Sequence, residues 1–332
     1  MDTIRWKSKT VIDAHCHFRH DEPVPHFYKI LELVNYTGAN LLALPGPGAD
    51  RQNTLVLERK ADRPDFFYAF GCLEHDPQRV AAGDGAYLAD QATRIMARYD
   101  GIKMLEGKPA VRRSYMPLAL DHAYFAPFFA RVAELNAPVT LHVSDPIDMW
   151  QGEHAYRDLD PQEEYFRQAE ALLKRHPSLR INFPHFMFLS PQLDRLAGLF
   201  DRYPGIMTDL AMGGEFLYYL SDNPDRGRDF FVRFQDRILY GTDINDRNAL
   251  KHARAKAELL RLFLETSETF YNLPELAMGR EPSKGSNGRV ELRGLALPQE
   301  TLDKVMGLNF QRFVSRVPKP LPAAAVPLGN HR

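Results

Sequence analysis

The sequence contains little cysteine and no long apolar stretch. Only Cys16 and Cys72 are present among 332 residues, and two distant cysteines form at most one bridge, so a disulfide framework is excluded. No apolar run approaches the length of a membrane span, and the N-terminal segment lacks the apolar stretch of a signal peptide. We therefore expect a cytoplasmic protein with no membrane contact.

An excess of charge of either sign is also missing. The chain has 42 Lys and Arg residues against 43 Asp and Glu residues, which gives a formal net charge of -1. A broad basic surface for nucleic acid or for an acidic membrane is therefore not expected. The chain is long enough to bury a large core, and (β/α)8 barrels commonly reach this length as one unit. We expect the partner to be a small-molecule substrate.

Short apolar runs recur along the chain, and each is long enough for one buried strand. The eight runs cover residues 10–18, 40–45, 66–73, 101–106, 138–143, 180–185, 206–211 and 238–243. Helical patterning fills most of the gaps between them, and strands that alternate with helices favour a parallel sheet. No Gly-rich dinucleotide loop follows the first run, which argues against an open doubly wound sheet. The sequence thus predicts a (β/α)8 TIM barrel.

The part of the chain after the eighth run predicts a helical extension. A long helical stretch covers residues 248–271, and a last helix covers residues 298–317. The polar segment between them contains a possible hairpin at Ser286, Asn287 and Gly288. We expect a single barrel domain over residues 1–316 and an extended Pro-rich tail over residues 317–332.

The first run carries the clearest chemical signal. Side chains alternate along a strand, so Asp13, His15 and His17 are expected on one face and Cys16 on the other. Two histidines spaced in this way can reach one metal ion, and active sites of (β/α)8 barrels lie at the C-terminal ends of the strands. The alternative for each histidine taken alone is a buried side chain with satisfied hydrogen bonds.

Three other runs end on a residue that can bind a metal. His142 closes the fifth run, His185 closes the sixth and Asp243 closes the eighth. Together with His15 and His17, these side chains predict a divalent metal site at the mouth of the barrel.

The order of these residues resembles that of the amidohydrolase superfamily. The closer resemblance is to its amidohydrolase-related branch, which includes relatives of aminocarboxymuconate semialdehyde decarboxylase. The matching pieces are IDAHCHF, LHVSD, INFPHF, RILYGTD and GLNFQRFV, which spread over residues 10–315. Two stretches differ from the decarboxylase pattern, because Phe186 follows His185 directly and no aromatic residue closely follows His142.

The resemblance implies a role for each residue that matches the family motif. His15, His17, His142 and Asp243 would bind the metal, while His185 would either bind it as well or polarise the substrate. We expect one ion, zinc by default, with manganese or another divalent ion as alternatives. The relatives also suggest a homodimer or a higher homo-oligomer.

The predicted activity is hydrolysis of an amide, ester or lactone bond in a small anionic substrate through a metal-activated water. Asp243 would carry the proton, and His185 would stabilise negative charge on the substrate oxygen. Two alternatives stay open. One is a metal-dependent decarboxylase of a small carboxylic acid, and the other is a non-catalytic metal-binding barrel.

Charged residues near the strand ends are candidate substrate contacts. Lys103 and Glu106 lie on the fourth run, Arg112 follows it, and Glu215 follows the seventh. Lys103 and Arg112 could bind an anionic group of the substrate. Alternatively, Lys103 bridges two metals or pairs with Glu106, and Arg112 belongs to a solvated loop.

Overall fold

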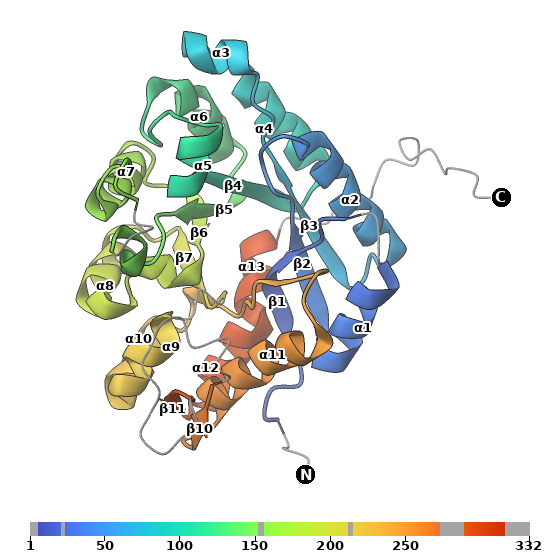
Figure 1. The fold of residues 1–332 in the computed structure, drawn as a ribbon, viewed down its shortest axis with the longest axis vertical. Helices are drawn as coiled ribbons and strands as arrows, with labels where there is room; N and C mark the ends of the chain where they lie inside the picture. The colour runs from blue at the N-terminus through green and yellow to red at the C-terminus, as the bar shows by residue number, and fades with distance from the viewer. Residues whose placement is uncertain (1–5, 21–23, 152–155, 212–214, 273–288, 316–332) are drawn as a thin grey trace, which may run out of the picture.

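The protein forms a ring of parallel strands enclosed by helices (Figure 1). The computed structural model describes residues 6–20, 24–151, 156–211, 215–272 and 289–315, and the side chain of Glu215 is not described. The strands are β1 Ile12–His17, β2 Gly38–Leu42, β3 Phe67–Cys72, β4 Gly101–Gly107, β5 Pro138–Val143, β6 Arg180–Phe183, β7 Ile206–Asp209, β8 Ile238–Leu239 and β9 Ile244–Asn245. Each strand from β1 to β8 lies within one of the predicted runs or overlaps it.

The ring closes between the last strands and the first. The strand order is β8-β7-β6-β5-β4-β3-β2-β1-β9, so β8 pairs with β7 while β9 pairs with β1. Between β8 and β9, the Tyr240 carbonyl accepts from the Ala14 amide at 2.9 Å, and the Asp243 amide donates to the His15 carbonyl at 2.9 Å. β8 and β9 are therefore two ends of one interrupted strand, and the predicted (β/α)8 barrel is confirmed.

Amphipathic helices cover the outside of the ring (Figure 1). In α4, for example, Leu88, Ala92 and Ile95 are buried along one side of the helix. The helices are α1 Val24–Val34, α2 Ala49–Asp62, α3 Pro77–Ala82, α4 Tyr87–Arg98, α5 Pro109–Ser114, α6 Ala126–Glu134, α7 Gln162–Arg175, α8 Leu193–Arg202, α9 Glu215–Asp222, α10 Pro224–Arg233, α11 Leu250–Glu265, α12 Gln299–Asp303 and α13 Asn309–Val314.

The last helix closes the barrel at the N-terminal ends of the strands. Phe310 and Phe313 of α13 each lie 6.4 Å from the Phe70 ring, between ring centroids, and pack in the same buried cluster as Ile12. The Asn309 side chain donates to the Ile238 carbonyl at 2.8 Å. The opposite end of the barrel, where the strands finish, is not covered by this helix.

A small antiparallel pair follows the barrel strands, formed by β10 Thr269–Tyr271 and β11 Glu291–Arg293. The predicted turn at residues 286–288 lies outside the described residues, as does the predicted tail at 317–332. None of the helices in the described ranges combines the length and the apolarity that crossing a bilayer requires.

Candidate metal centre and active site

A β-bulge in β1 determines which side chains reach the mouth of the barrel. Asp13 pairs with Ala39 of β2 and Cys16 pairs with Leu41, so β1 has one more residue than its partner in this interval. An extra residue inverts the alternation of side chains. Below the bulge, Ile12 belongs to the cluster inside the barrel. Above it, His17 lines the cavity at the mouth.

The expectation that Asp13 shares a face with His15 and His17 was therefore wrong. Asp13 is not one of the described residues that line the cavity. It is instead fully buried against Thr242. Its carboxylate accepts hydrogen bonds from the Thr242 amide at 3.1 Å and from the Thr242 hydroxyl. Burial raises the pKa of Asp13 to about 6, although these hydrogen bonds oppose the rise. The pair ties β1 to the segment that carries Asp243.

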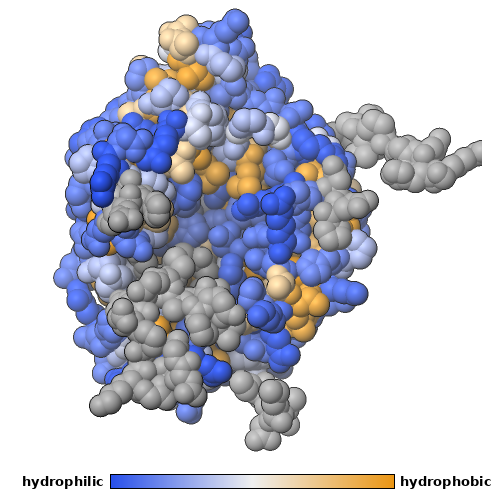
Figure 2. All heavy atoms as spheres, in the orientation of Figure 1, coloured by the Kyte–Doolittle hydropathy of each residue, from blue (hydrophilic) through white to orange (hydrophobic). Residues whose placement is uncertain are grey.

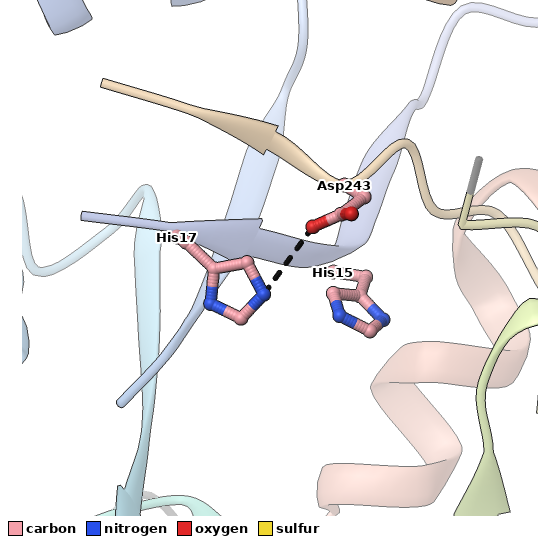
Figure 3. Close-up of side chains that lie close together, drawn as sticks. All are labelled: His15, His17 and Asp243. Atoms are coloured by element: carbon pink, nitrogen blue, oxygen red, sulfur yellow. Dashed lines mark ion pairs between the residues drawn. The ribbon is translucent and has the colours of Figure 1, made fainter. Parts of the chain in front are cut away.

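Three metal-binding side chains converge at the mouth (Figure 3). His15 and His17 extend from β1, and Asp243 extends from the neighbouring segment between β8 and β9. One potential ligand atom from each residue lies within 4.8 Å of the others. The Nε2 atom of His17 lies 3.3 Å from Oδ1 of Asp243. Asp243 adopts a left-handed backbone conformation with φ of 55°, which is uncommon for a residue other than glycine.

The hydrogen bonds of the imidazoles leave the same nitrogen available on each ring. His17 Nδ1 lies 2.9 Å from the Leu42 carbonyl, and His185 Nδ1 lies 3.0 Å from the Ala211 carbonyl. A carbonyl only accepts, so both Nδ1 atoms donate, and each Nε2 carries the lone pair. His15 Nδ1 donates to the Asp209 carboxylate at 3.0 Å with the same result. Such contacts fix histidine ligands in the tautomer that binds metal.

Burial also favours the uncharged imidazole, which is the form that binds metal. Desolvation lowers the pKa of His15 and of His17. Burial tends to raise the pKa of Asp243, but the close contact with His17 and the other nearby histidines hold that pKa well below the usual range. Two neutral imidazoles and one carboxylate form a donor set that suits a divalent metal ion. These residues thus fit the metal that the sequence predicted.

His142 is oriented differently from the other histidines. Its Nε2 lies 2.9 Å from the Ser144 carbonyl, and therefore donates there, and lies 3.3 Å from Oδ1 of Asp145. Asp145 also accepts hydrogen bonds from Lys108 and, at 2.9 Å, from the Tyr156 hydroxyl. His142 lines the cavity but is not part of the group formed by His15, His17 and Asp243. Its predicted role as a ligand is therefore not reflected in this arrangement.

His185 begins a left-handed turn, which the sequence did not suggest. The φ angles of His185, Phe186, Met187 and Phe188 are 58°, 56°, 52° and 52°. This conformation costs roughly 1–2 kcal/mol for each such residue. Burying a phenylalanine contributes about 1.5–3 kcal/mol, which is similar in size. Phe186 is fully buried and stacks on Phe216 at 5.8 Å between ring centroids. The turn presents His185 to the cavity, with Phe188 stacked on its imidazole at 5.3 Å.

The cavity around the candidate metal ligands has a volume of about 360 Å³. Figure 2 shows that this face of the molecule is hollowed near its centre, over the strands of the barrel. The lining residues are His15, His17, Arg19, Leu44, Lys103, Leu105, Lys108, His142, Asp145, Pro146, Met149, Tyr156, His185, Phe188 and Asp243. The volume lies within the range of small-molecule sites.

Of the predicted substrate contacts, only Lys103 is seen to line this cavity. Glu106 lies on the other face of β4, where its Oε1 is 2.8 Å from Nε2 of His75. Arg112 pairs with Asp160 at 3.1 Å, and it is not one of the described residues that line the cavity. For Glu215, only the backbone at the start of α9 is described.

Asp209 is a residue of the site that sequence reasoning missed. It ends β7, is fully buried, and accepts hydrogen bonds from Nδ1 of His15 at 3.0 Å and from the His185 amide at 3.0 Å. Asn182 donates to it at 2.7 Å. Burial tends to raise the pKa of Asp209, but the histidines lower it overall, so the carboxylate is ionised at neutral pH. Its position within the predicted run 206–211 was the only signal available in the sequence, because that run extends two residues beyond Asp209.

Solved structures of other proteins share this fold. The 2,6-dihydroxybenzoate decarboxylase from Rhizobium matches with a TM-score of 0.56 at 16% identity, over 92% of this chain and 99% of its own. The 5-carboxyvanillate decarboxylase from Novosphingobium aromaticivorans, in complex with manganese, matches with a TM-score of 0.53 at 15% identity, over 93% of this chain and 96% of its own. The 4-oxalomesaconate hydratase from Rhodopseudomonas palustris matches with a TM-score of 0.55 at 14% identity, over 92% of this chain and 95% of its own. At such identities the likeness concerns the fold. No curated protein matched the sequence.

A family model described as Amidohydrolase matches residues 12–315. The match begins on the first residue of β1 and ends just after α13, so it includes the whole barrel and the helix that closes it. It also includes the histidines of β1 and Asp243. The chain therefore belongs to the amidohydrolase family, and it is an enzyme of that superfamily.

Proposed function

We propose that the protein is a metal-dependent lyase that removes carbon dioxide from a small carboxylic acid. The observation that carries this proposal is Lys103, whose buried ammonium group lines the cavity and has no hydrogen-bond partner among the described residues. A substrate carboxylate would provide that partner. The fold shared with two decarboxylases and a hydratase supports this alternative better than the hydrolysis that the sequence favoured.

The residues of the cavity divide the chemical work between them. His15, His17 and Asp243 would hold a divalent ion, which supplies positive charge next to the substrate anion. Loss of carbon dioxide breaks one carbon–carbon bond and leaves its electron pair on the substrate carbon, which then takes up one proton. Asp243 and His185 both line the cavity and are the candidates to deliver this proton from solvent. Manganese, which the related decarboxylase structure contains, is a reasonable ion to test beside zinc.

The test is turnover by protein reconstituted with manganese or with zinc. Hydroxylated aromatic acids and aliphatic carboxylic acids are offered in deuterated water, and both carbon dioxide and deuterium in the product are measured. The proposal expects both signals, and it expects Asp243→Asn to lose them while remaining folded, since an amide can neither take up a proton from solvent nor pass it to the substrate carbon.

The same protein is also assayed with simple esters, lactones and amides. Turnover of these substrates without any release of carbon dioxide would support the hydrolase instead. Bound metal without turnover on either panel would support a non-catalytic metal-binding barrel.

A further inference from the structure

We propose that the substrate carries two carboxylates on an apolar body, one held by Lys103 and the other by Arg19. This inference rests on the proposed function for the first carboxylate and adds the second. It follows from the cations that line the cavity, from the partners that some of them have, and from the apolar side chains that line the same cavity.

Most of the basic residues near the mouth already have a carboxylate partner. They lie on α5 or just before it, and each pairs with an aspartate from the segment between β5 and α7. The pairs are Lys108 with Asp145, Arg112 with Asp160 and Arg113 with Asp158. These pairs connect two surface segments, so their cations have little capacity left to bind a substrate anion.

Lys103 is the first of two exceptions. It lies in the middle of β4 and is completely buried, yet no described group accepts a hydrogen bond from its ammonium. Asp209 and Asp243 attract this charge without a hydrogen bond. A buried ammonium group is costly unless it is paired. An occupant of the cavity that offers a carboxylate oxygen would remove part of this cost.

Arg19 is the second exception. It follows His17 directly after β1, is exposed, and lines the same cavity. Its backbone is fixed by a hydrogen bond from the Gln52 side chain to the Arg19 carbonyl at 3.0 Å. Its guanidinium group has no hydrogen-bond or ion-pair partner among the described residues. The planar guanidinium fork matches the geometry of a carboxylate, which makes arginine well suited to this contact.

The cavity that both cations line also has apolar side chains in its wall. Leu44, Leu105, Pro146, Met149 and Phe188 all line the cavity. An apolar body such as a ring would pack against these side chains, and its charged groups would pair with the cations. Molecules without charge would leave both cations unpaired, and those with one carboxylate would satisfy only one of them.

The charges of the lining favour the same class of substrate. Lys108 and Asp145 cancel, and Asp243 offsets one of the two cations Lys103 and Arg19, which leaves an excess of one positive charge. A divalent ion at the three ligands would raise this excess further. A dicarboxylate therefore complements the loaded cavity better than a monocarboxylate does.

The test measures binding by calorimetry with manganese-loaded protein, so it does not depend on turnover. Benzoate and isophthalate are the probes, because they differ by one carboxylate on the same ring. The proposal expects isophthalate to bind at least about tenfold more tightly than benzoate, a difference of about 1.4 kcal/mol. Arg19→Gln should remove most of that advantage, so that it weakens isophthalate much more than it weakens benzoate. Arg19→Lys should keep part of it, since the charge remains.

Arg94→Gln is the matched control, because Arg94 is also an exposed arginine and lies on α4, away from this cavity. It should bind both probes as the unaltered protein does. The proposal is overturned if the unaltered protein shows no preference for isophthalate, including the case in which neither probe binds. It is also overturned if Arg19→Gln weakens both probes equally. Failure of the proposed function would look different, with the preference intact and no carbon dioxide released from any acid.

Discussion

The Nδ1 atom of His15 donates to Oδ2 of Asp209 at 3.0 Å, which joins residues that are 194 positions apart in the sequence. Both side chains are buried. This bond determines which nitrogen of His15 is free to bind a metal, because Nδ1 is already used. Asp209 also accepts from the His185 amide, so one carboxylate orients two histidines of the site.

Replacing Asp209 should therefore weaken metal binding without removing a ligand. In Asp209→Asn, the amide cannot hold His15 as an anion does, and partners of a histidine ligand typically contribute 10–100-fold to metal affinity. We expect a loss of that size, measured by competition with a chelator. Asp65→Asn is the control, because Asp65 is exposed and distant from the site. Unchanged affinity in Asp209→Asn would contradict the role assigned to this carboxylate.

The histidines of the site should differ in how much bound metal is lost when each of them is replaced. His17→Gln removes a member of the ligand group, so most of the bound metal should be lost. His142→Gln should retain close to the full amount, because His142 does not belong to the group formed by His15, His17 and Asp243. Metal content by plasma mass spectrometry distinguishes the two variants. Equal losses would mean that His142 turns towards the metal when it binds.

Lys103 should decrease stability in the absence of a substrate. Desolvation by burial lowers its pKa from 10.5 to about 8. At a pH where the lysine is charged in both the folded and the unfolded protein, this shift lowers the free energy of unfolding by about 3 kcal/mol. Lys103→Met should therefore unfold at a higher temperature or urea concentration in metal-free protein, while losing affinity for carboxylates. Lys174→Met, at an exposed position, is the control and should change stability little.

The gain from Lys103→Met should depend on pH in a defined direction. Below pH 8 the lysine is protonated in both the folded and the unfolded states, so its buried charge destabilises the folded protein by the full amount. Between pH 8 and 10.5 the lysine of the folded state loses its proton first, and this destabilisation declines. Urea unfolding at several pH values should thus show the largest advantage of the variant below pH 8 and almost none near pH 10.5. An advantage that grows with pH would contradict this explanation.

Arg112 should be important for stability rather than for binding substrate. Its guanidinium group pairs with Asp160 at 3.1 Å, donates to Gln168 at 3.3 Å and lies 5.0 Å from the centre of the Tyr165 ring. We expect Arg112→Gln to lower the free energy of unfolding by about 1–3 kcal/mol. KM should change less than about threefold. A large rise in KM with unchanged stability would restore Arg112 as a substrate contact.

The barrel was predictable because its signal is repeated. Each buried strand needs an apolar run and each crossover needs a helical segment, so several independent observations supported the same architecture. The order of His15, His17 and Asp243 at strand ends likewise indicated where these side chains would meet. Zinc as the specific ion, and the oligomeric state, stay predictions.

Side-chain direction was harder to predict. One extra residue in β1 inverts the alternation on which the placement of Asp13 relied, and a bulge has no clear mark in the sequence IDAHCH. The direction of Glu106 could have been predicted, because residues 103 and 106 differ by an odd number and so face opposite sides of a regular strand. Asp209 could not have been assigned, since its partners come from distant strands.

The position of Asp243 has a mechanical consequence. It lies in the gap between β8 and β9, where the end of the ring meets β1, and Asp13 bonds to Thr242 across 229 positions of sequence. An ion held jointly by β1 and Asp243 would therefore form a reversible cross-link between the first and last strands. At a concentration one hundred times its dissociation constant, such an ion adds about 2.7 kcal/mol to the stability of the closed form. Amide hydrogens where β1 meets the segment that carries Asp243 should exchange more slowly as the ion is supplied. Their exchange rate would then measure how much of the site is occupied.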